Sequence, residues 1–379
     1  NPMYKKRGGI IMKRKLLLAL IAAMTVSMSV PVFAAPSIGQ YVEKTTKNTT
    51  GISGGQKLVV ENLDTSIIKN ETAKSAMDEF SNSNEKNKLE KLLVDLGVDT
   101  TKPVPTDNGG TASPVYYEPA TPAFNLAISE ADKLKYELTG SVTTTLTVES
   151  LKDKDKDNIL IMVTDADGKV HYITPDALDP KTGELTVTFT ALGSVVILEK
   201  APIVSKNLES DKYENENVKA AAEQFKSAEE GTAVSDIFAA AGEGTTVKDQ
   251  NGEDVDISQY KTCGSLVEVA MKLGDEYFTN AECQFEGTVQ MDLEQVDYKA
   301  LLKSAGIDEN TSDEDLLNVE EFEAPDYVLA QLNAVSGEAS VSTGLKFGFE
   351  KVEGSDRPVL VIKGTFNGLG PVALASKAE

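Results

Sequence analysis

Apolar residues recur at helical spacing in two separate parts of the chain. Residues 73–80 carry apolar side chains at i, i+3, i+4 and i+7, and residues 89–96 repeat that spacing. Residues 218–225 and 234–241 show the same two stripes. Each pair of stripes is followed at once by a glycine, a residue typical of helix C-termini. The pattern therefore predicts a pair of amphipathic helices near the start of each part.

The two parts are also related in sequence. Residues 62–97 align with residues 207–242 at a constant offset of 145 without a gap, and nine of the 36 positions are identical. Unrelated stretches of average composition would share about two. A second match pairs TFTALGSVVILEK from Thr188 with TFNGLGPVALASK from Thr365 at an offset of 177, which indicates an insertion of 32 residues. We interpret the chain as an internal duplication.

From Tyr136 onward the hydrophobic period changes to two, which predicts β-strands. In the first part we expect strands at 142–148, 159–163, 169–173, 185–189 and 195–198. Asp167-Gly168 is a hairpin signal between the second and third of them. In the second part we expect strands at 266–273 and 283–291 around a Gly274-Asp275 turn, an acidic helical insertion at 298–322, and strands near 339–350, 359–365 and 372–374.

These elements predict an α+β fold of two tandem duplicated modules. Each module is expected to hold an N-terminal amphipathic helix pair followed by an antiparallel β-sheet or small sandwich. The expected divisions are a signal peptide with upstream residues at 1–34, a flexible lead-in at 35–57, and modules at 58–200 and 201–379.

The first 34 residues resemble a secretory signal peptide in their order of charge and hydrophobicity. Lys13 to Lys15 form a basic segment, an apolar run follows, and small residues ending at Ala34 provide a cleavage site. The alternative is an uncleaved membrane anchor, because residues 16–34 could just span a bilayer. Cleavage predicts a secreted, extracellular or cell-envelope protein with no membrane association afterwards.

The charge balance argues against nucleic acid as a partner. The chain has 60 acidic and 37 basic residues, a formal net charge of −23. Six of the basic residues and none of the acidic ones fall in residues 1–35, so the remainder carries a net charge of −29. Such a surface repels phosphate backbones and anionic membranes.

Two sets of residues are candidates for a metal site and a disulfide. Asp153, Asp155 and Asp157 occupy positions 1, 3 and 5 of a sequence that starts like a calcium loop, although later ligand positions depart from that pattern. A solvated turn is the alternative, and calcium is the one cofactor that the sequence suggests. Cys263 and Cys283 are the chain's two cysteines. They either pair after export or remain buried thiols.

Catalytic motifs are few and incomplete. Ser53 lies in a literal G-x-S-x-G pattern, but in a polar stretch without a preceding strand. A serine hydrolase also needs a base, and His171 is the single histidine, expected on a sheet surface. A carboxylate-based hydrolase needs only two acids and stays open as an alternative. The absence of tryptophan argues against sugar-stacking sites, although tyrosine can substitute.

Tyr116 and Tyr117 stand in the proline-rich stretch 103–122, which we expect to be extended or looped. Two adjacent tyrosines on a loop can form a binding platform, or they can anchor the loop to the domain. They are therefore candidates for a ligand loop.

The segments ILIMVTDADGKVHYI and GELTVTFTALGSVVILEK resemble the closing strands of repeat modules in secreted and surface proteins of Gram-positive anaerobes. That resemblance covers about 45 residues per copy and carries no catalytic residues. It implies an extracellular, non-enzymatic protein of several modules. We therefore expect a structural, adhesive or binding role, with an envelope or extracellular protein or polysaccharide as partner. The alternatives are an extracellular carboxylate-based hydrolase and a calcium-stabilised surface protein.

Overall fold

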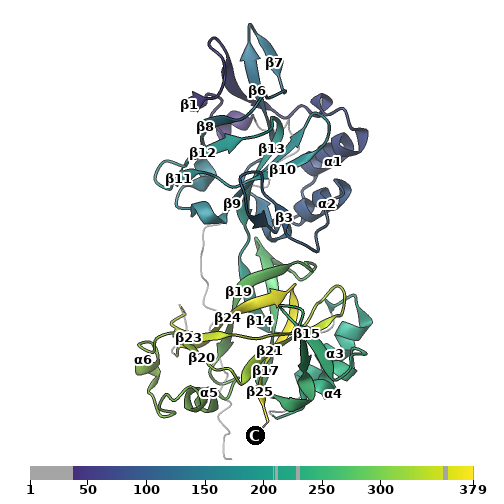
Figure 1. Ribbon diagram of the computed structural model, residues 1–379, viewed down its shortest axis with the longest axis vertical. Coiled ribbons are helices and arrows are strands. Elements are labelled where there is room, and N and C mark those ends of the chain that lie inside the picture. Colours follow the sequence, from purple (N-terminus) through teal and green to yellow (C-terminus); the bar gives the residue numbers. More distant parts are fainter. Residues whose placement is uncertain (1–36, 208, 210–211, 228–230, 353–356, 379) are drawn as a thin grey trace, which may run out of the picture. The chain divides into compact units, whose positions relative to one another are not determined.

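The computed structural model describes residues 37–378, apart from 208, 210–211, 228–230 and 353–356 (Figure 1). The predicted signal peptide lies outside the described residues. Within them the fold is a mixed α+β arrangement of mostly antiparallel sheets with a few helices. None of the described helices is long and apolar enough to cross a membrane.

Both predicted helix pairs are present. The first pair is α1 (Glu71–Asn82) with α2 (Lys88–Asp95), and the second is α3 (Glu216–Ser227) with α4 (Val234–Ala239). The bounds of α1 and α3 differ by 145 at both ends, and those of α2 and α4 agree with this offset to within one residue. Of the predicted stripes, Leu96 is half-buried, and the other described members are buried: Ala73, Ala76, Met77, Phe80, Leu89, Leu92, Leu93, Val218, Ala221, Ala222, Val234, Ile237, Phe238 and Ala241.

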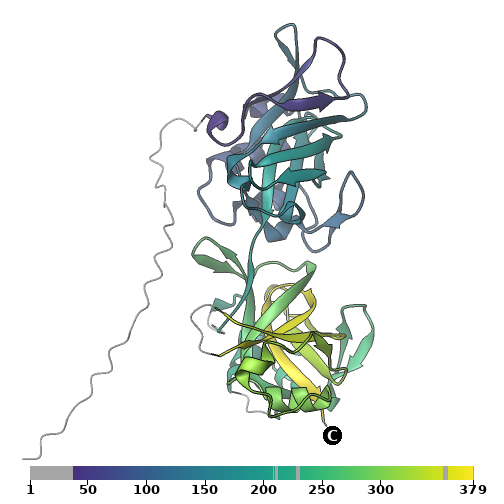
Figure 2. The same ribbon diagram turned by 90° about the vertical axis from the view of Figure 1, so that its left-hand side faces the viewer.

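The first part of the chain holds two antiparallel sheets, which can be followed in Figures 1 and 2. The larger has the order β10-β9-β13-β6-β2: Val170–Ile173, Ile159–Asp165, Gly193–Lys200, Phe124–Glu130 and Lys57–Asn62, with β5 (Tyr117–Pro119) and β7 (Lys133–Lys135) at its margins. The smaller has the order β1-β8-β12-β11: Lys47–Thr50, Val142–Thr147, Glu184–Phe189 and Ala177–Asp179. A short ribbon joins β3 (Val104–Pro105) to β4 (Thr111–Ala112).

The second part repeats the strand order of the larger sheet. Its larger sheet runs β22-β21-β25-β17-β14: Ala339–Ser342, Tyr327–Leu332, Gly370–Lys377, Tyr260–Leu273 and Ile203–Asn207, with β18 (Glu276–Phe278) beside β17. β15 (Thr246–Asp249) and β16 (Asp254–Asp256) extend the edge at β22, where β15 pairs in parallel. The smaller sheet runs β19-β24-β23-β20: Gln284–Asp292, Val359–Asn367, Lys346–Glu350 and Phe322–Glu323.

Each part is built in three layers, because the central strands of its larger sheet are buried on both faces. In β13, Val195 and Ile197 belong to the core shared with the smaller sheet. Val196 and Leu198 face the opposite way, into the core that contains α1 and α2. The second part follows the same plan, with Ala373 and Ala375 of β25 in the core of α4. Figure 1 shows each helix pair beside its own strands.

Three expectations differ from the structure. Residues 35–57, expected to be a flexible lead-in, contain β1, which pairs with β8. The Gly274-Asp275 turn joins β17 to the three-residue strand β18, whereas β19 belongs to the other sheet. The stretch 298–322 contains two short helices, α5 (Tyr298–Ser304) and α6 (Asp313–Leu316), rather than one.

A glycine at the start of the last strand of each part allows that strand to enter the sheet. Gly193 has φ 151° and Gly370 has φ 145°. A Cβ atom on Gly193 would lie 2.2 Å from the carbonyl oxygen of Thr164, and one on Gly370 would lie 2.3 Å from that of Leu332. Backbone cannot yield as a side chain can, so both positions require glycine.

We predict that Gly193→Ala and Gly370→Ala each lower the free energy of unfolding by about 3 kcal/mol or more, because the clash is with backbone. Chemical denaturation followed by circular dichroism measures the change. Gly54→Ala and Gly244→Ala are matched controls, since an added Cβ meets nothing within 4 Å at either position. Equal stability of all four variants would contradict the assignment.

Candidate functional site

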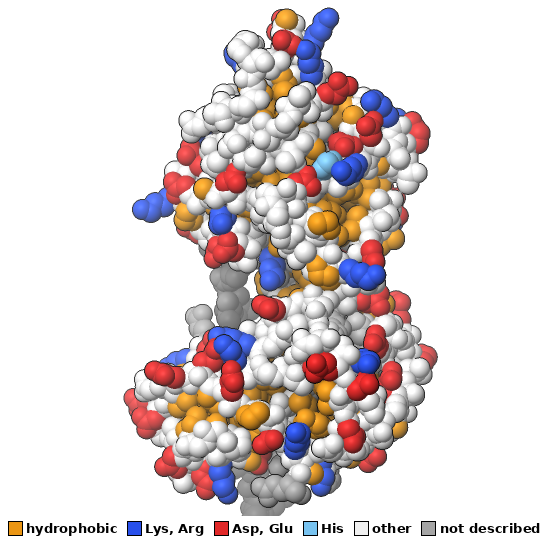
Figure 3. All heavy atoms as spheres, viewed as in Figure 1, with side chains coloured by type: hydrophobic (Ala, Val, Ile, Leu, Met, Phe, Trp, Pro, Cys, Tyr) orange, Lys and Arg blue, Asp and Glu red, His pale blue; other side chains and the backbone are white. Residues whose placement is uncertain are grey.

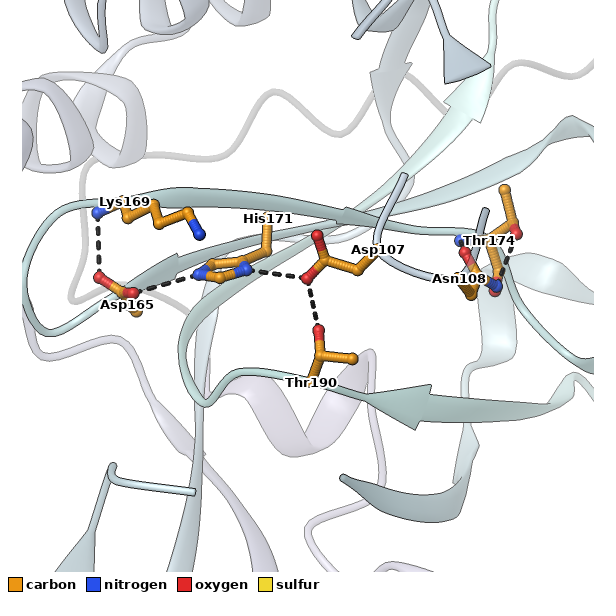
Figure 4. Close-up of polar contacts among 7 residues, drawn as sticks. All are labelled: Asp107, Asn108, Asp165, Lys169, His171, Thr174 and Thr190. Atoms are coloured by element: carbon orange, nitrogen blue, oxygen red, sulfur yellow. Dashed lines mark hydrogen bonds and ion pairs between the residues drawn. The ribbon is translucent and has the colours of Figure 1, made fainter. Parts of the chain in front are cut away.

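The single histidine lies in a polar cluster on the first part of the chain (Figure 4). His171 is on β10, with its Nδ1 2.8 Å from Asp107 Oδ2 and its Nε2 3.1 Å from Asp165 Oδ2. The Thr190 hydroxyl donates to the same Asp107 oxygen. The histidine side chain is 12% exposed, so the cluster lies just below the surface. On the face seen in Figure 3, acidic and basic side chains are interspersed.

Three separate segments place these groups. Asp165 ends β9, and its other oxygen accepts from the Lys169 N–H at 2.9 Å within the hairpin turn. Asp107 and Asn108 are on the loop between β3 and β4. The Asp107 N–H donates to the Tyr172 carbonyl at 2.8 Å, and Asn108 binds the Thr174 hydroxyl at 2.8 Å. The cluster therefore fixes the β3–β4 loop against the edge of the larger sheet.

Both ring nitrogens of His171 face carboxylate oxygens. Partial burial on its own would raise the pKa of Asp107, but the hydrogen bonds from Thr190 and His171 outweigh that effect and lower it.

This arrangement does not assemble a nucleophile. Both ring nitrogens of His171 contact carboxylates, so neither is left to accept a proton from a serine, threonine or cysteine. The nearby Thr190 hydroxyl donates to Asp107 and not to the histidine. Ser53 lies in the turn between β1 and β2, where its N–H binds Gln56 Oε1 at 3.0 Å. That turn leads into a strand, unlike the strand-to-helix elbow of hydrolases.

Of the three aspartates of the candidate calcium loop, Asp155 uses its carboxylate in a local turn, and Asp157 pairs with Lys156 at 3.4 Å. Asp155 accepts from the Asp157 N–H at 3.0 Å, and the Asp153 N–H donates to the Pro180 carbonyl at 2.8 Å. Lys154 pairs with Glu199 at 2.7 Å. Across residues 37–378, leaving aside the gaps named above, no group of three or more His, Cys, Asp or Glu side chains is placed to hold a metal ion.

The two cysteines are both buried and are not bonded to each other. Cys263 is on β17 in the larger sheet of the second part, whereas Cys283 directly precedes β19 in the smaller sheet. The thiol of Cys283 contacts Ser113 Oγ at 3.2 Å. Burial raises the pKa of this thiol above its usual range, which disfavours the reactive thiolate. The structure therefore shows thiols where the sequence allowed a disulfide.

Tyr116 is 1% exposed and belongs to the core. Its hydroxyl donates to the Cys283 carbonyl, and its ring lies 4.8 Å from that of Phe285. Burial raises the pKa of Tyr116 far above its usual value. Tyr117 is on β5, which pairs with the end of β13. Tyr116 of the proline-rich stretch is thus in contact with Cys283 of the second part. Because it is buried there, Tyr116 has no open surface for a ligand.

Sequence reasoning identified His171 but missed its partners. Asp107 is 64 residues away and lies in a stretch read only as proline-rich. No local pattern marks such a pair, because the β3–β4 loop reaches the histidine only through the tertiary fold. Likewise, Tyr116 and Cys283 are separated by 167 positions in the sequence, so no local pattern reveals their contact.

Comparison with known proteins adds no family. No protein-family model matches the chain, and no curated protein matches it either. The functional argument therefore depends on the geometry of this molecule.

We predict that His171→Ala destabilises the fold by about 1–3 kcal/mol, since it leaves two carboxylates partly buried without their shared donor. Thermal and urea denaturation at neutral pH measure the change. In the Asp107→Asn background the same substitution should cost less, because one of the two charges is already absent. Additive losses would contradict the shared-donor arrangement.

The lowered pKa of Asp107 predicts a dependence on acidic pH. The carboxylate is stabilised in the folded state, so its contribution is complete above the ordinary aspartate value and is lost as pH falls through the lowered folded value. Asp107→Asn should therefore be less stable than the parent at pH 7, with a difference that shrinks towards pH 2. A difference independent of pH would contradict this account.

We predict that Tyr116→Ala lowers the free energy of unfolding by about 3–5 kcal/mol, because a large buried ring leaves a cavity beside Phe285. Calorimetry should also show the second part unfolding separately from the first. Tyr116→Phe should cost only about 1 kcal/mol, the value of one hydrogen bond. Tyr117→Phe is the adjacent control. If Tyr117→Phe lowers the free energy of unfolding as much as Tyr116→Ala does, the assignment of Tyr116 as the buried anchor is contradicted.

Proposed function

We propose that the chain is a secreted or cell-envelope protein of two tandem duplicated α+β modules with a structural, adhesive or binding role. The modules are assigned to residues 58–200 and 201–379. The single observation that carries the proposal is the repeated strand order, β10-β9-β13-β6-β2 against β22-β21-β25-β17-β14. Repeat proteins commonly use their stacked units to present extended binding surfaces, and the proposed role rests on that analogy.

A matched contact in both halves supports the duplication. Asn70 accepts from the Ala73 N–H at 3.0 Å at the start of α1, and its Cβ lies against Gly168 in the β9–β10 turn. Asn215, at the equivalent position, accepts from the Val218 N–H at 3.3 Å. Its side chain lies against Gly337 in the β21–β22 turn. The same helix cap therefore meets the same hairpin twice.

The features that differ between the halves support a joined pair of modules. Tyr116 and Ser113 come from the proline-rich stretch, which the second half lacks, and they contact Cys283. In addition, Glu90 of α2 accepts a hydrogen bond from Asn280. The single-copy segments thus connect the modules, as suits a binding or structural protein that presents two modules together.

The alternatives have less support. A serine hydrolase requires a histidine nitrogen that can accept a proton, whereas both nitrogens of His171 contact carboxylates. A carboxylate-based hydrolase requires a pair of acids open to substrate, whereas Asp107 and Asp165 both contact His171. Calcium stabilisation requires converging oxygen ligands, whereas Asp155 binds a backbone N–H instead. Neither arrangement favours a second function over binding.

The test uses the predicted mature chain, residues 35–379, with purified Gram-positive cell walls. We expect the protein to sediment with the walls and to release no reducing ends from them, because the proposal is binding without catalysis. Bovine serum albumin is the control for trapping. Hydrolysis abolished by a single carboxylate or serine substitution would overturn the proposal. A melting temperature raised by millimolar calcium would instead support the calcium-stabilised alternative.

A further inference from the structure

A cavity of about 550 Å³ opens beside β14, β17 and β18 in the second half of the chain. Its lining contains two lysines, three acidic side chains, a tyrosine and a threonine. Lys206, Glu268 and Tyr277 form its centre. The lining therefore carries both signs of charge and is close to neutral.

The centre of the cavity is a charged pair largely removed from water. Lys206 Nζ lies 2.9 Å from Glu268 Oε2, and their side chains are 16% and 4% exposed. The ammonium also lies 5.2 Å from the ring centroid of Tyr277. Lys206 Nζ also lies 3.3 Å from Glu209 Oε1. Burial alone would lower the pKa of Lys206, but the contacts with Glu268 and Glu209 outweigh burial and raise it. Tyr277, by contrast, is 48% exposed, so much of its ring is open to a ligand.

In the first half, an amide replaces the carboxylate of Glu268 at the equivalent position. Lys206 and Glu268 are cross-strand partners on β14 and β17, as Glu61 and Asn125 are on β2 and β6. Asn125 is fully buried, donates to the Asp64 carbonyl at 3.0 Å and accepts from the Ser194 hydroxyl at 3.0 Å. At this position the fold can therefore be built with a buried amide that makes its hydrogen bonds within the protein.

The charged pair in the second half needs another explanation than folding. Removing two charges from water is unfavourable, and their mutual attraction only partly offsets that. Tyr213 is buried as well, and its pKa is raised first by burial and then by Glu268. Costly polar groups beside a cavity are typical of a binding site.

We propose that this cavity binds a saccharide unit of an envelope glycan, an inference that rests on the proposed binding function. Sugar hydroxyls both donate and accept, and the lining offers ammonium donors and carboxylate acceptors together. The C–H face of a sugar ring suits the negative face of an aromatic ring, which Tyr277 offers with about half its surface exposed. The mixed charge suits a neutral saccharide better than a phosphate or a divalent cation.

The test is a titration of the ¹⁵N-labelled chain, residues 35–379, with N-acetylglucosamine tetramer and with cellotetraose, followed by NMR. We expect shifts centred on residues 206, 268 and 277, with a dissociation constant on the order of 1 mM or tighter. Tyr277→Ala should weaken binding about tenfold or more. Leu134→Ala is the matched control, because Leu134 holds the equivalent place beside β6 and is 45% exposed.

Glu268→Gln provides a second variant that keeps the side-chain size, and it should also weaken binding about tenfold while the circular dichroism spectrum stays the same. No shift with either sugar up to about 10 mM would overturn the inference. Shifts at these residues with a peptide but with neither sugar would overturn the inference as well. If the protein still binds cell walls and Tyr277→Ala has no effect, the cavity fails while the proposed function stands. If the unsubstituted protein does not bind cell walls, the proposed function itself is overturned.

Discussion

In each half of the chain, the last strand in sequence occupies the middle of the larger sheet. β13 pairs with β9 on one side and β6 on the other, and β25 pairs with β21 and β17. The remaining strands cannot form a complete sheet until this strand is in place. The constraint explains the glycines that begin β13 and β25, since the strand enters between two backbones already close together. It also explains why these strands are buried on both faces.

The helices were predictable because their information is local. A stripe at i, i+3 and i+4 with a glycine behind it specifies a helix within a dozen residues, and α2 and α4 both follow this pattern. Strands that alternate apolar and polar residues, such as β12, were also visible. Among the strands that escaped prediction, β6 and β21 are buried on both faces: β6 interrupts its apolar run with Asn125, and β21 is buried throughout. A strand of that kind shows no alternation.

The polar sites were not predictable for a different reason. The partners of His171 and of Tyr116 come from distant segments, and their meeting depends on loops whose paths no local pattern gives. The two half-sheets show how one scaffold accommodates different chemistry. At one cross-strand position the first half buries an amide with internal partners, whereas the second half keeps a charged pair beside open space. The same strand order in the larger sheets thus carries a buried amide in one half and a charged pair in the other.

The contact of Tyr116 with the second half has a consequence for the order in which the chain is made. All strands of the first half's sheets are complete at Lys200, whereas the carbonyl that receives the Tyr116 hydroxyl belongs to Cys283, a further 83 residues along the chain. During synthesis the first half can close its own sheets while this ring still lacks its neighbour Phe285. An aromatic side chain left without cover attracts other apolar surfaces, including those of a second nascent chain. The interval between residues 200 and 285 is therefore the period in which this protein is most exposed to misassembly.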